Sequence, residues 1–435
     1  MSATTPFVVV DDDPTGTQTM AGVRVLLGLD REVLQAAASR PWPAVHLMTN
    51  SRAAAPEVAK RLVRDACEAA AAFWPDAEYV LRGDSTLRGH LVEEYDAVRE
   101  IRFPGREPVL LLAPALPEAG RITVDGVHLL ARDGARQPLH DTEYARDPAL
   151  GYPDAHLLRW AEHRSAGRFA AADGLHVPLA DLRADGTDAV LERLRRLAAS
   201  GAAVCATDAE TVEDLRAVAD AFLAARAEDL PVVLRCAPTL AGILSGATAD
   251  GPAALPPPGP GGVLLVCGSF VPTTTRQLAA VARAHPDTVV EPDLAALVDP
   301  SLREVQRCAA AVAARLAATG FAVLATPRPD IAAPGGREDQ ERVADRMARV
   351  VASLPVAPAT LVTKGGVTSA VTIAAGLGAL AADVVGPVAP GVGRWDVITG
   401  AGRSMSCLVV PGNVGDDRLL VDLVDALLAP PAARA

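Results

Sequence analysis

Three consecutive aspartates, Asp11–Asp13, directly follow the first apolar stretch of the chain, in the sequence DDDPTGT. Adjacent carboxylates repel one another, so such a run is expected where a cation, a hydrogen-bond donor or a reacting proton uses them. A turn in which one aspartate caps the backbone while the others are solvated would also account for it. The position after a predicted buried strand favours a functional role, because strand-end loops carry ligand sites in α/β proteins.

A second group of polar side chains occupies the sequence LRGDSTLRGH at residues 81–90. Arginine binds carboxylates through a planar pair of donors that lysine cannot reproduce, so Arg82 and Arg88 are candidates for anion binding. Internal ion pairing with Asp84 is the alternative, and both can hold at once. Arg52 adds another arginine at the end of a different predicted strand, which is a weak signal on its own.

Glycine-containing segments in the second half of the chain each follow an apolar run and precede a predicted helix. They are CGSF at 267–270, KGGVTSA at 364–370 and PGNVGD at 411–416. Glycine lets backbone N–H groups approach a phosphate, and the N-terminus of a following helix adds partial positive charge. One such turn is common in α/β proteins, but three in one domain predict an anion or nucleotide site. Lys364 could add a point charge there, or its backbone could face inward while its side chain is solvated.

Several known motifs are absent from the sequence. It contains no P-loop, no HExxH, no GxSxG nucleophile elbow and no Cys–His metal spacing. The spacing Gly376-x-Gly378-x-x-Ala381 imitates a dinucleotide fingerprint, but it lies inside a predicted helix and not at a strand-to-helix turn. The histidines of the first half (His90, His128, His140 and His176) are interpreted as loop or core residues rather than ligands.

Composition excludes some classes of protein. The 435 residues include 41 Lys+Arg against 53 Asp+Glu, a net charge of −12 that argues against nucleic acid as the main partner. The longest apolar run is too short to span a membrane, which needs about 20 residues. Six scattered cysteines without a CxxC pair predict reduced, buried thiols. With no signal peptide expected, these features indicate a cytoplasmic protein.

Apolar β-rich runs alternate with helical stretches along the whole chain, which predicts parallel α/β architecture. Strands are expected at 7–10, 45–49, 79–81 and 109–112, helices at 56–73 and 188–199, and an irregular, functional segment at 114–153. In the second half, strands are expected at 263–266, 321–325, 360–363 and 406–410, and helices at 273–285, 337–353, 368–380 and 416–428.

A linker is predicted at residues 251–262, where GPAALPPPGPGG cannot continue a helix or a sheet. It separates an expected N-terminal domain, residues 1–250, from an expected C-terminal domain, residues 263–435. Each domain is predicted to hold a largely parallel sheet flanked by helices, with the active site in the cleft between them. The oligomeric state stays open, a homodimer included.

These segments, in this order, resemble the four-carbon acid sugar kinase family over essentially the whole chain. DDDPTGT and LRGDSTLRGH resemble the family's DD-x-TG opening and its DSTLRG box, and APALPEAGRITVDGVHLL resembles a family segment with the pattern P-x-x-GR. GSF, KGGVTSA and PGNVG resemble the start and the Gly-rich loops of the family's nucleotide domain. The chain departs from the family at Pro14, at GGVT where many members have GGDT, and at PGNVGD in place of a KSGGFG-like loop.

The resemblance implies an N-terminal domain that binds the sugar acid and a C-terminal domain that binds ATP. The implied substrate-binding residues are Asp12, Arg52, Ser85, Thr86, Leu87 and Arg88. The implied nucleotide-binding residues are Ser269, Gly365, Gly366, Val367, Thr368, Gly412, Asn413 and Gly415. The missing aspartate of the GGVT loop leaves the metal ligands undetermined.

The predicted function is ATP-dependent phosphorylation of the terminal hydroxyl of a threonate, an erythronate or a 3-oxo-tetronate. Arg52 and Arg88 are expected to hold the substrate carboxylate, and Asp12, or next Asp84, to orient and deprotonate the hydroxyl. Mg²⁺ is expected to bridge the ATP phosphates, because it needs few protein ligands. The alternatives are a sugar-acid sensor without catalysis and, further behind, a metal-dependent lyase or aldolase that uses the aspartates.

Overall fold

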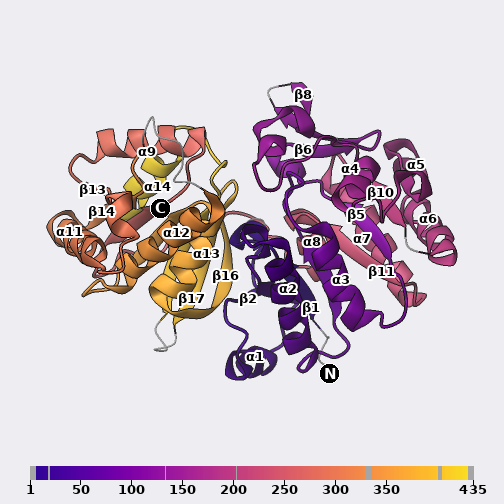
Figure 1. Ribbon diagram of the computed structural model, residues 1–435, viewed down its shortest axis with the longest axis horizontal. Coiled ribbons are helices and arrows are strands. Elements are labelled where there is room, and N and C mark those ends of the chain that lie inside the picture. Colours follow the sequence, from indigo (N-terminus) through magenta and orange to yellow (C-terminus); the bar gives the residue numbers. More distant parts are fainter. Residues whose placement is uncertain are drawn as a thin grey trace. The chain divides into compact units, whose positions relative to one another are not determined.

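The computed structural model describes residues 6–17, 20–132, 134–201, 203–328, 336–399 and 404–429. The chain folds into two compact units (Figure 1). The N-terminal unit comprises Met1–Val23 and Leu29–Thr248, and the C-terminal unit comprises Arg24–Gly28 and Ala249–Ala435. Strand β2 (Arg24–Leu26) thus belongs to the C-terminal unit, although it lies near the beginning of the sequence.

The N-terminal unit is built on a parallel sheet with the strand order β3-β1-β4-β11-β5-β10-β9. Its strands are β1 (Phe7–Asp11), β3 (Ala44–Met48), β4 (Glu78–Arg82), β5 (Val109–Ala113), β9 (Leu175–Val177), β10 (Val204–Thr207) and β11 (Val232–Cys236). Continuous apolar runs such as VLLLA in β5 are buried along their length. This is the pattern of a parallel sheet covered on both faces, and it confirms the predicted fold class.

Helices connect and cover these strands. They are α1 (Arg31–Ala38), α2 (Pro56–Ala71), α3 (Leu91–Arg102), α4 (Leu157–Arg164), α5 (Leu179–Asp185), α6 (Thr187–Ser200), α7 (Val212–Ala227) and α8 (Pro238–Ser245), with short 3-10 turns η1 (Pro14–Thr17), η2 (Ser51–Ala53), η3 (Pro117–Ala119), η4 (Leu139–Asp141), η5 (Glu143–Arg146) and η6 (Ala171–Asp173). The predicted helices at 56–73 and 188–199 are confirmed as α2 and α6. Pro56 occupies the first turn of α2, where its missing N–H costs nothing.

The segment at 114–153, expected to be irregular, contains a small antiparallel sheet. It has the order β6-β7-β8, formed by β6 (Arg121–Val124), β7 (Val127–Arg132) and β8 (Ala135–Pro138). The expectation of an irregular segment is wrong for this part. Strands of four to six residues that are partly exposed carry little apolar periodicity, and only their pairing identifies them.

The C-terminal unit has a mixed sheet. Parallel strands β13 (Val289–Val290), β14 (Phe321–Ala325), β12 (Val263–Cys267), β15 (Thr360–Lys364) and β18 (Ser404–Val410) lie side by side, and the sheet continues antiparallel through β17 (Val392–Thr399), β16 (Ala379–Ala389) and β2. Its helices are α9 (Pro272–Ala284), α10 (Leu294–Leu297), α11 (Arg303–Thr319), α12 (Gly336–Ala352), α13 (Gly366–Val371) and α14 (Leu419–Leu428). The main core lies between the parallel strands, α9 and α14.

The helix expected at 368–380 ends early. Helix α13 passes into a π-helical turn η7 (Thr372–Gly376), and β16 begins at Ala379. The Ala-rich sequence favours helix locally, but pairing of β16 with β17 and β2 decides its state. The dinucleotide-like glycine spacing therefore runs from a helix end into a strand, which is the reverse of the fingerprint's context.

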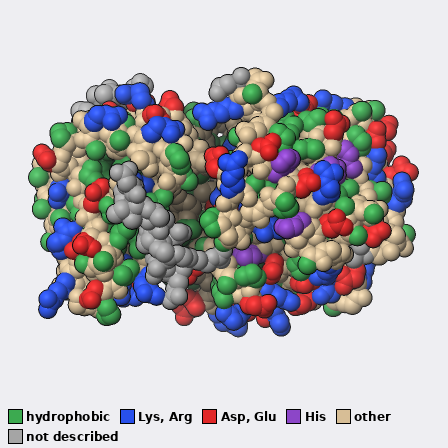
Figure 2. Space-filling view, turned by 45° about the horizontal axis from the view of Figure 1, so that its top comes forward, with side chains coloured by type: hydrophobic (Ala, Val, Ile, Leu, Met, Phe, Trp, Pro, Cys, Tyr) green, Lys and Arg blue, Asp and Glu red, His purple; other side chains and the backbone are tan. Residues whose placement is uncertain are grey.

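All six cysteines are free and buried, as the sequence predicts. No helix within the described ranges is long and apolar enough to cross a membrane. Figure 2 shows Lys and Arg side chains interspersed with Asp and Glu on the face that it presents. The charged side chains discussed in the next subsection are those that are buried at the ends of strands.

Candidate functional site

The carboxyl ends of three neighbouring strands bring the predicted substrate-binding residues of the N-terminal unit together. Strand β1 lies between β3 and β4, and Asp11 is in register with both Met48 and Arg82. The aspartates that follow β1 therefore lie between the loop after β3, which carries Arg52, and the end of β4. Ligands of open parallel sheets bind at this kind of edge.

Two arginines hold the aspartate cluster. Arg52 donates from Nε and Nη2 to the two oxygens of Asp12, at 2.8 and 2.6 Å, and from Nη1 to Asp13 Oδ2 at 2.6 Å. Arg82 is 1% exposed and donates from Nε to Asp11 Oδ1 at 2.7 Å, with Nη1 3.0 Å from Asp12 Oδ1. Burial acts to raise the pKa of Asp11 and Asp13, but the neighbouring guanidiniums lower both below the usual value.

His46 is a third partner of the aspartate cluster. Its Nδ1 lies 2.6 Å from Asp11 Oδ2, and both side chains are fully buried. Each oxygen of Asp11 thus has its own partner, His46 or Arg82. The three adjacent carboxylates are tolerated because these buried groups pair with them and offset part of their charge, an ion-pair network that sequence spacing alone did not reveal.

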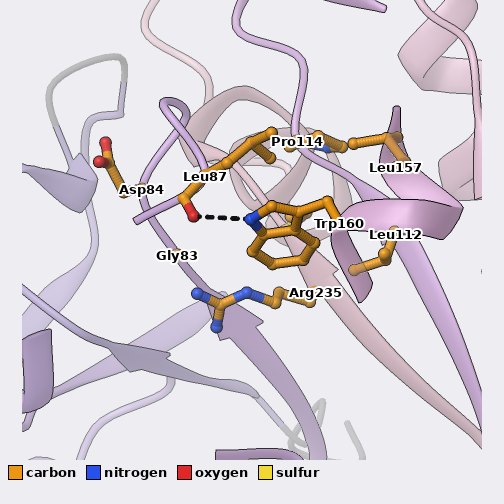
Figure 3. A pocket seen from close by; sticks show the side chains of 9 residues that line it. Gly83, Asp84, Leu87, Leu112, Pro114, Leu157, Trp160 and Arg235 are labelled. Carbon is orange, nitrogen blue, oxygen red and sulfur yellow. Dashed lines mark hydrogen bonds between the residues drawn. The ribbon is translucent and has the colours of Figure 1, made fainter. Parts of the chain in front are cut away.

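The loop at residues 83–90 is held by its backbone carbonyls. His128 Nε2 donates to Ser85 O at 2.9 Å, Tyr152 Oη to Thr86 O at 2.7 Å, and Trp160 Nε1 to Leu87 O at 3.1 Å (Figure 3). Three successive carbonyls are therefore bonded to side chains from one later segment. Leu87 has a φ of 65°, a left-handed conformation that is uncommon for a residue with a side chain.

The protonation of His128 follows from these bonds. A carbonyl can only accept, so Nε2 carries the proton, and Nδ1, 2.9 Å from Thr123 Oγ1, accepts from that hydroxyl. Burial is the main reason that the pKa of His128 falls to about 4. His128 is the neutral core residue expected from the sequence, and its contact with Ser85 makes it part of the loop's support.

Asp84 and Arg88 pair within the loop. Arg88 donates from Nε to Asp84 Oδ2 at 2.7 Å and lies 3.6 Å from Asp147 through Nη1. Thr86 Oγ1 also donates to Asp84. Burial would raise the pKa of Asp84, but the charges of Arg88 and then Arg52 lower it far below the usual range. These neighbours favour the ionised form of Asp84, and Arg52 couples it electrostatically to the neighbouring cluster.

A second buried ion pair lies against the loop at residues 83–90, and it was not predicted from the sequence. Arg235, at the end of β11, donates from Nη1 to Glu94, which also accepts from Ser51 Oγ at 3.1 Å. A Cβ atom on Gly83 or Gly89 would lie 2.5 or 2.8 Å from Arg235 Nη2, so the guanidinium fills the space that side chains there would need. The two glycines that bracket DSTLR were the only sequence signal for it.

A small pocket opens beside this arginine. Its lining residues are Gly83, Asp84, Leu87, Leu112, Pro114, Leu157, Trp160, Arg235 and Cys236 (Figure 3). The enclosed space has room for about one water molecule. The indole of Trp160 lines one side of it (Figure 3).

The predicted nucleotide loops of the C-terminal unit converge on Ser269. A Cβ on Gly412 would lie 2.8 Å from Ser269 Oγ, and one on Gly365, whose φ is 107°, would lie 3.0 Å from Ser269 Cβ. A Cβ on Gly268 would lie 2.5 Å from Thr368 Oγ1. The glycine loops therefore pack tightly around Ser269 and Thr368, a cluster called the cradle below, and side chains at these glycines would collide with those two residues.

The remaining predicted residues of this site flank the cradle. Gly366 and Val367 open α13, and Val367 is 40% exposed. Asn413 and Gly415 lie in the connection between β18 and α14, where Gly415 has a φ of 86°. These positions are consistent with one loop cluster at the carboxyl ends of β12, β15 and β18.

The side chain of Lys364 bonds to the backbone of the loop that follows β18. Its Nζ is buried and donates to Pro411 O at 2.8 Å and to Val414 O at 2.9 Å, while Gln277 donates to Val414 O and Asp416 O. Burial lowers the pKa of Lys364 to about 8. The expectation of a solvated side chain is wrong, because the ammonium is buried against two backbone carbonyls.

Arg328 was not identified from the sequence and lies in this site. It follows β14, donates from Nη1 to Ser269 O, and its Nη2 lies 3.1 Å from Cys267 Sγ. Its guanidinium also lies over the ring of Phe270, 5.6 Å from the ring centre. Arg328 has no carboxylate partner among the described residues, so it brings to the cradle a positive charge that no described carboxylate balances.

Among the described residues no group of three or more His, Cys, Asp and Glu side chains could hold a metal ion. The candidate carboxylates of the N-terminal site all accept from arginine. A divalent cation would therefore have to bring most of its ligands with it, as Mg²⁺ does when nucleotide phosphates bind it.

Comparisons with known proteins follow this division into two units. A sugar-binding N-terminal domain model matches residues 7–244, and a nucleotide-binding C-terminal domain model matches residues 264–420. A D-erythronate kinase from Heliobacterium modesticaldum is 34% identical over 275 residues. The match covers 60% of this chain and 56% of that relative, so it spans little more than half of the relative's length.

Solved structures show the same fold. A Salmonella typhimurium LT2 protein described as a tRNA synthase has a TM-score of 0.70 at 18% identity, covering 96% of this chain and 98% of its own. A Haemophilus influenzae protein of the DUF1537 family has a TM-score of 0.64 at 17% identity, covering 97% of this chain and 100% of its own. At such identities the likeness concerns the fold alone.

Proposed function

Since the chain belongs to the four-carbon acid sugar kinase family, we propose that it is an ATP-dependent kinase that phosphorylates the terminal hydroxyl of a four-carbon sugar acid. The observation that supports this most strongly is the cradle around Ser269, where glycine-containing loops from the ends of three strands meet, since backbone N–H groups of such loops can bind phosphate. D-Erythronate is the first substrate to test, because a relative carries that name.

In this proposal the N-terminal site binds the acceptor. Arg52 and the loop from Ser85 to Arg88 donate hydrogen bonds to its oxygens, and Asp12 or Asp84 accepts from the reacting hydroxyl. The hydroxyl oxygen attacks the terminal phosphorus of ATP, the bond to ADP breaks, and the hydroxyl proton leaves to a carboxylate or to water. Catalysis of this kind depends mainly on positioning and charge neutralisation.

The carboxylates are better suited to orienting the hydroxyl than to removing its proton early. Both oxygens of Asp12 accept from Arg52, and the pKa of Asp84 lies far below its usual value. Phosphoryl transfer through a loose transition state does not require a strong base, because the proton can leave late. Ser269, Gly365–Thr368 and Gly412 would surround the phosphates, and Mg²⁺ would arrive with ATP.

The experiment is ADP formation by the purified chain with a panel of erythronates, threonates and 3-oxo-tetronates. Phosphorus NMR of the product then identifies the phosphorylated oxygen. Asp12→Asn and Arg88→Ala should each lower turnover strongly with the best acid. The absence of ADP formation with every acid would refute the proposal, and thermal stabilisation by an acid without ADP formation would indicate a binding protein instead.

A further inference from the structure

The N-terminal site lacks net positive charge once its ion pairs are counted. Even with His46 counted as a cation, five carboxylates meet four positive groups in it: those of Asp11–Asp13, Asp84 and Asp147 against Arg52, Arg82, Arg88 and His46. One negative charge is left in excess before a substrate binds. A sugar acid brings a further negative charge, so these arginines alone do not supply the attraction that its carboxylate needs.

Arg121 is a buried cation without such a partner. It lies at the start of β6, is 7% exposed, and donates from Nη1 to Ala119 O at 2.8 Å. Its Nε is buried without a hydrogen-bond partner, and no carboxylate of the described ranges forms an ion pair with it. Arg235, buried to a similar extent, has Glu94 as its partner.

A buried guanidinium without a counter-ion is unfavourable, because desolvation is not repaid by an opposite charge. Proteins keep such a group where a ligand supplies the missing anion, and arginine offers two parallel donors that match a carboxylate. The Nε of Arg121, which has no hydrogen-bond partner, is one of the guanidinium donors that a carboxylate can engage in this way.

The fold connects Arg121 to the substrate loop. Arg121 and Thr123 are two residues apart on β6, so their side chains lie on the same face of the strand. Thr123 bonds to His128, and His128 donates to Ser85 O, each at 2.9 Å. The positive charge of Arg121 also contributes to the lowered pKa of His128, so the two side chains are electrostatic neighbours.

We propose that Arg121 binds the carboxylate of the sugar acid and so selects acids over neutral polyols, an inference that rests on the proposed kinase function. Arg52 and Arg88, balanced by aspartates, then act as hydrogen-bond donors to the hydroxyls and the reacting phosphate. The net charge that favours an anionic substrate comes from Arg121.

The test is calorimetric binding of D-erythronate to the full chain in the absence of ATP, or of whichever panel acid supports the fastest ADP formation. Arg121→Gln should weaken binding about ten- to hundredfold, the range expected for losing a hydrogen-bonded charge. Arg121→Lys, which keeps the charge but not the fork, should recover part of the loss. The affinity for erythritol, the neutral analogue, should differ less between wild type and variant than the affinity for the acid does.

Arg193→Gln is the matched control. Arg193 on α6 also donates to backbone carbonyls, those of His176 and Ala189, but it has Asp181 as its ion-pair partner. Its replacement should leave the affinity for the acid unchanged. Thermal melts establish whether the variants fold. If Arg121→Gln does not fold, the affinity of Arg121→Lys for the acid is compared with that of the wild type instead.

The inference would be overturned if a folded Arg121→Gln variant bound the acid as tightly as the wild type. If only Arg121→Lys folds, unchanged acid binding by that variant would overturn it. Either result would leave the kinase function intact. An equal loss of acid and erythritol binding would also overturn it, because a structural role predicts that result. Failure of the wild type to form ADP with any acid would instead refute the proposed function.

Discussion

Lys364→Met offers a quantitative test of how the nucleotide cradle is built. The buried ammonium of Lys364 donates to Pro411 O and Val414 O, and neither partner is an acid. Burial lowers its pKa to about 8 from a usual 10.5. The unfolded chain therefore binds this proton more tightly than the folded chain does, and the charged form destabilises the fold below pH 8.

The magnitude follows from the difference between the two pKa values. A difference of about 2.5, at about 1.4 kcal/mol for each pKa unit, corresponds to about 3 kcal/mol. The free energy of unfolding of the wild type should therefore rise by about 3 kcal/mol, relative to Lys364→Met, between pH 8 and pH 10.5. Methionine cannot titrate, so contributions from other groups cancel in the difference between the two proteins.

The assay is urea unfolding of the full chain and of the variant across this pH range, followed by circular dichroism. Parallel stability curves would refute the reasoning, because they would mean that Lys364 keeps its ordinary affinity for the proton. The variant should also raise the KM for ATP through loosening of the loop at 411–416. The KM for the sugar acid should stay as it is.

Further variants test other parts of the two sites. Arg328→Ala should raise the KM for ATP about tenfold or more, the range expected for a charge-assisted contact, with Arg328→Lys intermediate in steady-state kinetics. Gly412→Ala, whose Cβ would lie 2.8 Å from Ser269 Oγ, should weaken ADP binding measured by calorimetry. Asp84→Asn should lower kcat/KM for the acid, and any acid limb of the pH–rate profile should be the same in wild type and variant, because the pKa of Asp84 lies far below its usual value. Trp160→Phe, which removes one hydrogen bond, should cost about 1 kcal/mol of stability and weaken acid binding in calorimetry.

Each of these expectations has a contrary result. An Arg328→Ala enzyme that loses affinity only for the acid would place that arginine outside the nucleotide site. ADP binding unchanged in Gly412→Ala would show that the cradle has room for a side chain. An acid limb that disappears in Asp84→Asn would show that Asp84 titrates in the working range. A Trp160→Phe protein with wild-type stability and affinity would mean that the indole bond does not position the loop.

Much of the fold could be predicted because its strands and helices carry strong local signals. The buried apolar run of β5 and the amphipathic helix α2, with Pro56 in its first turn, are each legible within a dozen or so residues. Strand β16 was missed because its Ala-rich beginning favours helix, and only pairing with β17 and β2 makes it a strand. Strands of the small sheet β6-β7-β8 were missed because they are short and partly exposed, with little apolar periodicity.

The residue types and their places at strand ends were properties of the sequence alone. The aspartate run, the DSTLRG box and the glycine segments all stand where β-rich runs end, which was enough to expect two ligand sites and the family. Which charges cancel one another was decided only by the tertiary structure. Arg52 and Arg82 pair with the aspartates, Lys364 faces carbonyls, and Arg121 and Arg328 are without carboxylate partners in the described chain. The physical reason is that an ion pair depends on a few ångströms between side chains distant in sequence, and no local pattern encodes that distance.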